Sequence, residues 1–390
     1  MKQSLLILST TLMALNISIA QNAQVINQLN GKTIKTQNLS TDLQRIVDTG
    51  HIAGLSVAII QNSQTVYAHT FGFKNLEKQE KMDTNTVIYA GSFTKPFFST
   101  LFLQLVDKGI FELDKPIVQY LKKSIETYPK WQTLAHEKDL NKITARMILS
   151  HSSGMPILRY IYGDSLYLIA KPGEKLYYSN EGFNFLGFIV EEFTGKTLDN
   201  WAKELIYEPL NMHHSGLVWH SEFKDNHATG HDSEGKVFGV QVKENARAAG
   251  SLVTTTSDYG KFLTVLFQKQ LLSKILSNEM LKPQFKVTSF RGFGPLRDSI
   301  SNQFAAMNFS WSLGMMCFDT PYGKAYAHGC HLDGWQSYWV VYPQKNTILI
   351  LMSNSDNMEK NIYNLLEKTI GDVYSPMEWS TGIPCTIKNN

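Results

Sequence analysis

Apolar runs near both ends of the chain predict β-strands. Residues 55–60 and 65–69 form one predicted strand pair, with Asn62 and Ser63 in the turn between them. Near the other end, four further apolar runs predict strands at residues 311–317, 324–327, 337–341 and 347–352. The pattern predicts one antiparallel sheet to which both ends of the chain contribute.

Helical periodicity dominates between these strands, from about residue 113 to 281. Helices are predicted there at residues 143–149 and from Asn180 to Gly195. A third covers residues 198–206, with Thr197 as its cap and its end before Pro209. A fourth runs from a cap at Ser257–Asp258 to residue 267. Two more are predicted at 39–47, capped by Ser40 or Thr41, and at 357–370. The order favours a mixed α/β (α+β) fold, in which helices flank the antiparallel sheet and a mostly helical subdomain (about 113–285) is inserted.

The first twenty residues have the pattern of a secretory signal peptide. Lys2 is the only charge, an apolar core runs from Leu5 to Leu15, and Ser18 and Ala20 are small residues suited to cleavage. The apolar stretch is short for a membrane anchor, which is the alternative, and no cysteine offers a site for lipid attachment. We expect a periplasmic or secreted chain that starts at residue 21, without a stable membrane anchor.

The rest of the chain, 21–390, is expected to be one domain, with a core at about 39–374 and a C-terminal tail at 375–390. Hydrophobic residues make up 43% and charged residues 18%, as in globular proteins. The net charge of +3 gives no electrostatic reason to expect nucleic acid or a membrane surface as a partner. Among the three cysteines, a turn at 320–323 places Cys317 opposite about Tyr326, so a bridge between Cys317 and Cys330 is not expected, and Cys385 is the third.

Ser92 and Lys95 form an S-x-x-K motif where a predicted helix begins. A strand-like piece (86–90) and Gly91 precede the motif, and the helix runs to about Gly109 with one apolar face, made by Phe98, Leu101, Phe102 and Leu105. A lysine one turn after a serine lies on the same helix face. This spacing pairs a nucleophile with an amine base, which activation of a serine hydroxyl requires.

The motif alone is weak, because the chain contains two further copies. Ser221 with Lys224, and Ser233 with Lys236, have the same spacing in polar stretches that open no apolar helix. A serine at a helix start can also be only an N-cap. Only the context of Ser92 separates it from the other two.

A second candidate motif is Tyr178-Ser179-Asn180, just before a predicted helix. A tyrosine beside a lysine ammonium can have its pKa lowered enough to carry a proton to a leaving group, and an asparagine amide can bind a substrate amide. The alternative is a tyrosine packed on the core beside a turn asparagine.

The third candidate is the strand end at His328, Gly329 and Cys330, followed by His331. A strand edge beside Ser92 could pair with an extended substrate, and its N–H groups could form an oxyanion hole with that of Ser92. His328, Cys330, His331 and Asp333 are also metal-ligand types, but their spacing on a strand points them to alternate faces. A further cluster, His227, His231 and Asp232, is interpreted as a polar loop, and we expect no metal and no organic cofactor.

The order S-x-x-K, Y-x-N, H-x-C resembles the layout of the serine β-lactamase and penicillin-binding-protein superfamily, in its class C β-lactamase, D-Ala-D-Ala carboxypeptidase and esterase branch. The resemblance covers about residues 39–374 and includes the stretches 105–114, 148–154, 172–173, 249–258 and 353–355. It implies that Ser92 is the acylated nucleophile, that Lys95 is its base and that Tyr178 relays protons. It further implies that Asn180 contacts the substrate amide and that the N–H of His331 completes the oxyanion hole.

Two positions depart from the family pattern. His328 stands where class C β-lactamases have lysine, which is closer to the carboxypeptidase type, and a neutral histidine attracts a carboxylate less. Cys330 stands where glycine is usual and lets the substrate backbone approach. Both weaken the case for β-lactam-like substrates.

The sequence therefore predicts an exported serine hydrolase that acts through an acyl-enzyme on an amide or ester, a β-lactam or a D-amino-acid peptide. An esterase or D-Ala-D-Ala carboxypeptidase on the same site is one alternative. A non-catalytic binding or sensor domain is another. The expected partner is a small molecule or a peptidoglycan-like peptide, and the oligomeric state is left open.

Overall fold

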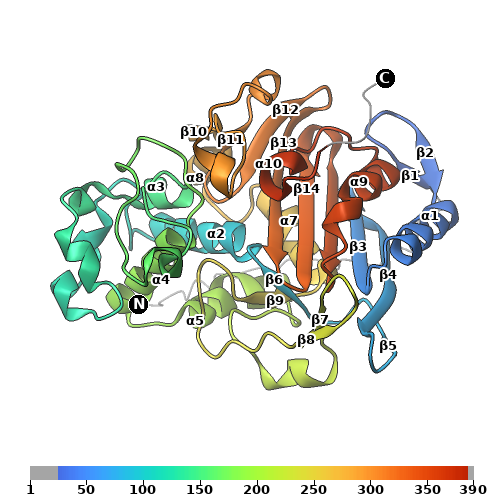
Figure 1. Cartoon of the computed structure of the whole chain (residues 1–390), viewed down its shortest axis with the longest axis horizontal. Coiled ribbons are helices and arrows are strands. Elements are labelled where there is room, and N and C mark those ends of the chain that lie inside the picture. The colour runs from blue at the N-terminus through green and yellow to red at the C-terminus, as the bar shows by residue number, and fades with distance from the viewer. Residues whose placement is uncertain (1–24, 385–390) are drawn as a thin grey trace, which may run out of the picture.

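A nine-stranded antiparallel sheet forms the centre of the computed structural model, which describes residues 25–384 (Figure 1). In spatial order its strands are β10 (Phe285–Lys286), β11 (Ser310–Trp311), β12 (Met316–Thr320), β13 (Gly323–Leu332), β14 (Trp335–Tyr342), β15 (Thr347–Ser353), β3 (Gly54–Gln61), β4 (Gln64–Asn75) and β5 (Glu80–Lys81). The pairing of β3 with β15 joins the two ends of the chain in one sheet, as the sequence predicts.

Two predicted hairpin registers are confirmed. Asn62 and Ser63 form the β3–β4 turn with positive φ values of 51° and 65°. Across β12 and β13, Cys317 lies opposite Tyr326. Cys317 and Cys330 are free, buried thiols, and Cys385 lies outside the described residues.

Helices cover both faces of the sheet. On one face, α2 (Thr94–Asp107) lies in the larger hydrophobic core, and α7 (Thr256–Phe267) packs on β3 and β15. On the other face, α1 (Thr36–Thr49) packs on β4 and on α9 (Ile362–Ile370), while α10 (Met377–Thr381) closes a second core. The sheet is therefore covered on both sides, and α2 is buried along most of its length.

In sequence, most of the remaining elements come between α2 and β10. They are the helices α3 (Ala145–Leu149), α4 (Asn180–Thr194), α5 (Leu198–Ala202), α6 (Glu208–Leu210) and α8 (Lys274–Leu281), and the strand pairs β6 (Ile88–Gly91) with β9 (Leu252–Thr254), β7 (Gly230–His231) with β8 (Val237–Gly239) and, near the start of the chain, β1 (Val25–Asn27) with β2 (Thr33–Lys35). Figure 1 shows α3 and α4 beside α2, on the side away from the large sheet. Within residues 25–384, no helix is both long and apolar enough to cross a bilayer. The predicted signal peptide, 1–20, lies outside the described residues.

Two predicted caps are wrong. Helix α1 begins at Thr36, so Ser40 lies inside it and hydrogen-bonds the Tyr67 hydroxyl at 2.8 Å. Helix α7 is capped by Thr255, whose hydroxyl accepts from the Asp258 N–H, and the Asp258 carboxylate instead accepts from the N–H of His214. In both helices a tertiary contact recruits the polar side chain that local pattern assigned to the cap.

Two predicted boundaries also differ. The run 311–317 is divided by a turn, where the Ser312 N–H bonds the Met315 carbonyl and Gly314 has a φ of 92°. The helix that starts at residue 198 continues through Pro209, because a π-helical stretch, Lys203–Tyr207, precedes α6. The wider π turn accommodates a proline that would break regular α-helical bonding.

Candidate active site

The turn from β6 into α2 positions Ser92 and Lys95. Gly91 has a φ of 47°, and the Thr94 hydroxyl ties the turn by donating to the Gly91 carbonyl at 2.5 Å. Lys95 lies in the first turn of α2, fully buried, and its Nζ is 3.1 Å from the Ser92 Oγ and 2.8 Å from the Ala249 carbonyl oxygen. The structure therefore brings the serine and the amine into hydrogen-bond contact.

Burial lowers the pKa of Lys95 to about 7. Its side chain forms no ion pair with any carboxylate among residues 25–384, so no carboxylate offsets the cost of burying its charge. A substantial fraction of the lysine is therefore a neutral amine near pH 7, which can accept the Ser92 proton.

Tyr178 is the third member of this cluster. Its ring centroid is 4.6 Å from the Lys95 Nζ, and its side chain hydrogen-bonds that of Ser92. Burial raises the pKa of Tyr178, and the bond to Ser92 offsets this only in part. This differs from the expectation of a lowered tyrosine pKa, because burial of the hydroxyl is the largest influence on it. The tyrosine is therefore a neutral hydroxyl able both to donate and to accept.

Asn180 is the first residue of α4, where the Ser179 hydroxyl caps the helix by accepting from the Gly182 N–H at 2.8 Å. The Asn180 Oδ1 is buried and has no hydrogen-bond partner among the described residues. Such an atom carries a desolvation cost that a substrate N–H would relieve.

His328 and Cys330 lie on β13, opposite Trp339 and Ser337 of β14. His328 is buried, and burial, followed by the charge of Lys95, lowers its pKa to about 3. Its Nδ1–H donates to the Gly329 carbonyl at 2.7 Å, which leaves Nε2 as an acceptor without a partner in the part of the chain described. His328 is therefore a neutral acceptor and does not attract a carboxylate.

The Cys330 thiol lies against the nucleophile's own backbone. The Ser92 N–H hydrogen-bonds the Cys330 sulfur, while burial raises the pKa of the thiol to about 12. The Ser92 N–H, which the sequence predicts to be one of the two donors of the oxyanion hole, is thus hydrogen-bonded to the Cys330 sulfur in this structure. The side chain of His331 points to the rim, where its Nδ1 is 2.8 Å from a carboxylate oxygen of Glu359 and its pKa is raised by this partner.

A cavity of about 250 Å³, here called the aromatic cavity, opens over Ser92. Ser92, Tyr178, Asn180, His328, Cys330 and His331 all line it, so every predicted site residue except the fully buried Lys95 borders one space. Its other walls are mostly apolar and include Phe293, Trp311, Met316, Met377 and Trp379. The only carboxylate among the lining residues is Glu359, which is paired with His331.

Sequence reasoning missed several of these walls. Met377 and Trp379 belong to α10, in the segment that the sequence suggests is a tail. The sequence also assigns no role to His151, although it is fully buried with a φ of 57°. Its ring centroid lies 4.3 Å from that of Tyr178, and its Nδ1 accepts from the Ser179 N–H at 3.0 Å. It therefore positions the Tyr178–Asn180 loop.

The other S-x-x-K copies form no such site. Lys224 and Lys236 are exposed, and neither follows a serine that opens a buried helix. His231 is a structural residue, since its Nε2 accepts from the Leu76 N–H and its Nδ1 lies 3.0 Å from the Asn354 carbonyl. Within residues 25–384, no three His, Cys, Asp or Glu side chains are grouped to hold a metal ion.

This chain belongs to the Beta-lactamase family, whose model matches residues 39–367. The fold is shared with the octameric penicillin-binding protein homologue from Pyrococcus abyssi (TM-score 0.70, 22% identity, 86% of this chain and 79% of that one). It is also shared with a class C beta-lactamase (TM-score 0.68, 17% identity, 87% of this chain and 96% of that one).

Among curated relatives, the chain is similar to the Unguisins hydrolase ungD' of Aspergillus campestris (strain IBT 28561), with 25% identity over 60% of this chain and 47% of the relative. It is also similar to Protein flp of Staphylococcus aureus (strain MRSA252), with 23% identity over 82% of this chain and 62% of the relative. The chain thus spans about half to two thirds of the length of these relatives.

Proposed function

We propose that the chain is a serine hydrolase that forms an acyl-enzyme on Ser92 and cleaves an amide or ester. The observation that carries the proposal is the Lys95 amine, buried without a carboxylate partner among the described residues and 3.1 Å from the Ser92 hydroxyl. Such an amine is costly to bury and serves no evident structural purpose. Membership of the family, and a relative named as a hydrolase, support the same reaction class.

In acylation, neutral Lys95 takes the Ser92 proton as Oγ attacks the substrate carbonyl carbon. The tetrahedral intermediate collapses when the carbon–leaving-group bond breaks, and the leaving group takes a proton from the Tyr178 hydroxyl, which Lys95 replenishes. In deacylation a water attacks the ester carbon, its proton passes to the Tyr178–Lys95 pair, and Ser92 Oγ leaves with a proton. The enzyme ends as it began, and water has been added across the substrate bond.

An ester or amide without a carboxylate beside the scissile bond is the favoured substrate. His328 is a neutral acceptor, and the described walls of the aromatic cavity supply only one cation, His331, which is already paired. Hydrolysis of a β-lactam or a D-Ala-D-Ala peptide, where a carboxylate lies near the scissile bond, is the second candidate, supported by the class C beta-lactamase fold.

The test is a parallel assay of a p-nitrophenyl ester, a chromogenic cephalosporin and a D-Ala-D-Ala peptide. Ser92→Ala is expected to abolish turnover, and intact-mass analysis is expected to show an adduct on Ser92 with a slowly released acyl group. Ser221→Ala is the matched control, because Ser221 opens another S-x-x-K motif but is exposed. Equal turnover by Ser92→Ala and the wild type would refute the mechanism.

Export is part of the proposal, supported by the pattern of residues 1–20. The expected mature N-terminus is Gln21, with the protein in the periplasm or the medium. N-terminal sequencing of the native protein tests this, and an uncleaved chain recovered from membranes would contradict it.

A further inference from the structure

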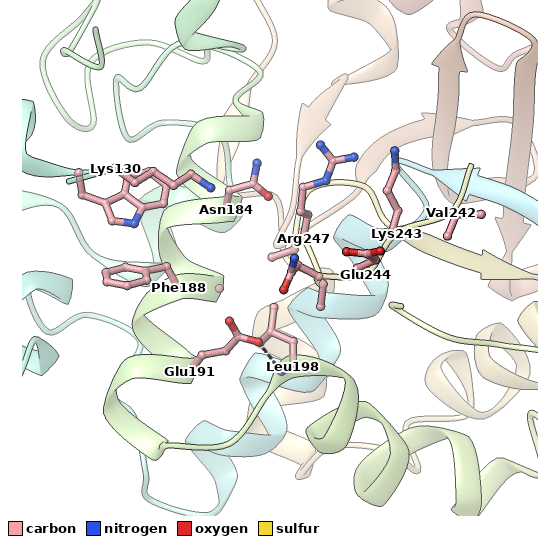
Figure 2. Close-up of a pocket in the computed structure, with 14 residues that line it drawn as sticks. Lys130, Asn184, Phe188, Glu191, Leu198, Val242, Lys243, Glu244 and Arg247 are labelled. Carbon is pink, nitrogen blue, oxygen red and sulfur yellow. Dashed lines mark hydrogen bonds between the residues drawn. The ribbon is translucent and has the colours of Figure 1, made fainter. Parts of the chain in front are cut away.

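We propose that a second cavity beside Ser92 binds a carboxylate carried by the substrate away from the scissile bond, and that Lys130 and Arg247 recognise it. The proposal rests on the proposed function, because it names the class of ester or amide that Ser92 cleaves. This cavity, here called the cationic cavity, measures about 660 Å³ and lies between α4 and residues 242–248 (Figure 2).

Three cationic side chains line the cationic cavity. Lys130 and Arg247 stand on opposite walls with Asn184 between them, and Lys243 stands beside Arg247 (Figure 2). None of the three forms an ion pair with a carboxylate of residues 25–384. The Lys130 Nζ lies 5.1 Å from the ring of Trp131, which lines the cavity, and the Lys243 Nζ lies 5.7 Å from the ring of Tyr89, which does not.

Arg247 and Lys130 carry like charges and line the same cavity. The pKa of Lys130 is lowered by burial first and then by the charge of Arg159, Glu181 acts in the opposite sense, and the charge of Arg247 makes the smallest contribution. Glu181 is itself engaged, because it accepts three hydrogen bonds from Arg159. An anion placed between Lys130 and Arg247 would relieve this repulsion, and a carboxylate would also meet the Asn184 amide.

Two carboxylates line the same cavity, but neither neutralises that pair. Glu191 lies at the other end beside Leu198, whose N–H it accepts at 2.8 Å, and burial raises its pKa (Figure 2). Glu244 is exposed next to Lys243, on the Arg247 side (Figure 2). The end at Lys130 therefore keeps an excess of positive charge.

The cationic cavity is joined to the catalytic residues by short covalent paths. Asn180 of the aromatic cavity and Asn184 of the cationic cavity are one turn apart on α4, and the Asn184 Oδ1 accepts from the Ala249 N–H at 3.2 Å. The Ala249 carbonyl in turn accepts from Lys95. Arg247 precedes Ala249 by two residues, which span at most about 7 Å. The proposed substrate extends along this side of α4, with its carbonyl at Ser92 and its anionic end between Lys130 and Arg247.

The experiment compares two esters of equal chain length, p-nitrophenyl hexanoate and mono-p-nitrophenyl adipate, which differ in a terminal carboxylate. The wild type is expected to prefer the adipate ester in kcat/KM. In Arg247→Glu and Lys130→Glu, the ratio of adipate to hexanoate kcat/KM is expected to fall at least about tenfold, the size of one charge-assisted contact. Arg247→Lys is expected to restore part of that ratio.

The control is Lys274→Glu, which changes the net charge equally at an exposed lysine that lines neither cavity. It is expected to keep the wild-type ratio. A wild type that prefers hexanoate, or a ratio unchanged in both charge-reversed variants, would overturn the proposal. Circular dichroism confirms that each variant is folded.

A binding measurement separates this proposal from the hydrolase proposal. Titration calorimetry of Ser92→Ala with mono-p-nitrophenyl adipate is expected to show binding that the added Arg247→Glu change weakens at least about tenfold. If the wild type hydrolyses neither ester but this binding difference is found, the hydrolase proposal fails and the cationic cavity stands. If the wild type hydrolyses the esters but the Arg247→Glu change leaves the affinity for mono-p-nitrophenyl adipate unaltered, only the proposal for the cationic cavity fails.

Discussion

The aromatic cavity borders the first residue of α4 and the cationic cavity borders the later turns of the same helix, yet the two cavities treat charge in opposite ways. At the aromatic cavity, burial keeps His328 in the wall neutral and Lys95 behind Ser92 partly neutral, and the ion pair of His331 with Glu359 lies at the rim. In the cationic cavity, more open to solvent, three cations stay without carboxylate partners among the described residues. The comparison indicates that proton transfer takes place at the aromatic cavity and that charge recognition, as proposed, takes place at the cationic cavity. A lysine base works only where its charge is costly, whereas an anion site needs charge that water can maintain.

Replacing the base should give the largest effect. Lys95→Met is expected to lower kcat about a thousandfold or more, because the neutral Tyr178 hydroxyl, which also bonds Ser92, is a far weaker base than the Lys95 amine. The same change is expected to raise the unfolding free energy by about 1–2 kcal/mol, since a buried amine is replaced by an apolar chain of similar size. Ester kinetics and chemical denaturation at pH 7 measure both, and a loss of both activity and stability would contradict this account.

The pH dependence of turnover should report the same neutral amine. Because the folded pKa of Lys95 is lowered to about 7, kcat/KM for a neutral ester is expected to fall about tenfold per unit below pH 7 and to level off above it. The free energy of unfolding is expected to rise with pH between about pH 7 and the ordinary lysine pKa. In that range the unfolded chain binds a proton at Lys95 that the folded chain has lost. Denaturant titrations at pH 7 and 9 check this, with Lys95→Met as the variant that should lose the trend.

Adding a cation to the aromatic cavity should give it some of the anion affinity proposed for the cationic cavity. His328→Lys is expected to raise the turnover of the cephalosporin or D-Ala-D-Ala peptide, relative to a neutral ester, by about tenfold. The reason is that a lysine ammonium can bind a carboxylate near the scissile bond, which neutral His328 cannot. His328→Gln is the control, since it keeps an uncharged acceptor, and an equal shift in both variants would show that charge is not the cause.

The smallest expected effect concerns Cys330. Cys330→Gly removes the sulfur that accepts from the Ser92 N–H and frees this donor for the substrate oxyanion. We expect kcat for a neutral ester to rise about threefold to tenfold, whereas Cys317→Ala, at a buried thiol that lines neither cavity, leaves it unchanged. A fall in kcat with Cys330→Gly, in a protein of unchanged stability, would mean that the thiol supports the site.

Local pattern was sufficient where neighbours in sequence are also neighbours in space. The sheet follows from strand runs and turns, and the contact between Ser92 and Lys95 follows from one helical turn. The walls of the aromatic cavity could not be found in this way, because Trp311 and Trp379 come from β11 and α10 and meet only through tertiary packing, with ring centroids 5.9 Å apart. The lowered pKa of Lys95 likewise depends on burial by many segments, which no motif records.

The cationic cavity shows the same limit more strongly. Lys130 and Arg247 are more than a hundred residues apart, in stretches with no recognisable motif, and the sequence's small net charge gives no sign of a local excess. A charged site assembled from loops is visible only when the backbone brings its members together.

The pairing of β3 with β15 has a consequence for how the chain folds. The Ser353 hydroxyl donates to the Gly54 carbonyl across a separation of 299 residues. Strand β3 is hydrogen-bonded along its length to β15, so this edge of β3 stays unpaired until β15 is in place. Contacts of such range close slowly, because the entropy of the intervening loop is lost before the strands are bonded. The first strand hairpin therefore stays without its neighbour until nearly all of the chain has been synthesised. Late completion of the sheet would be compatible with the export proposed above, since a chain that has not yet folded can cross a membrane.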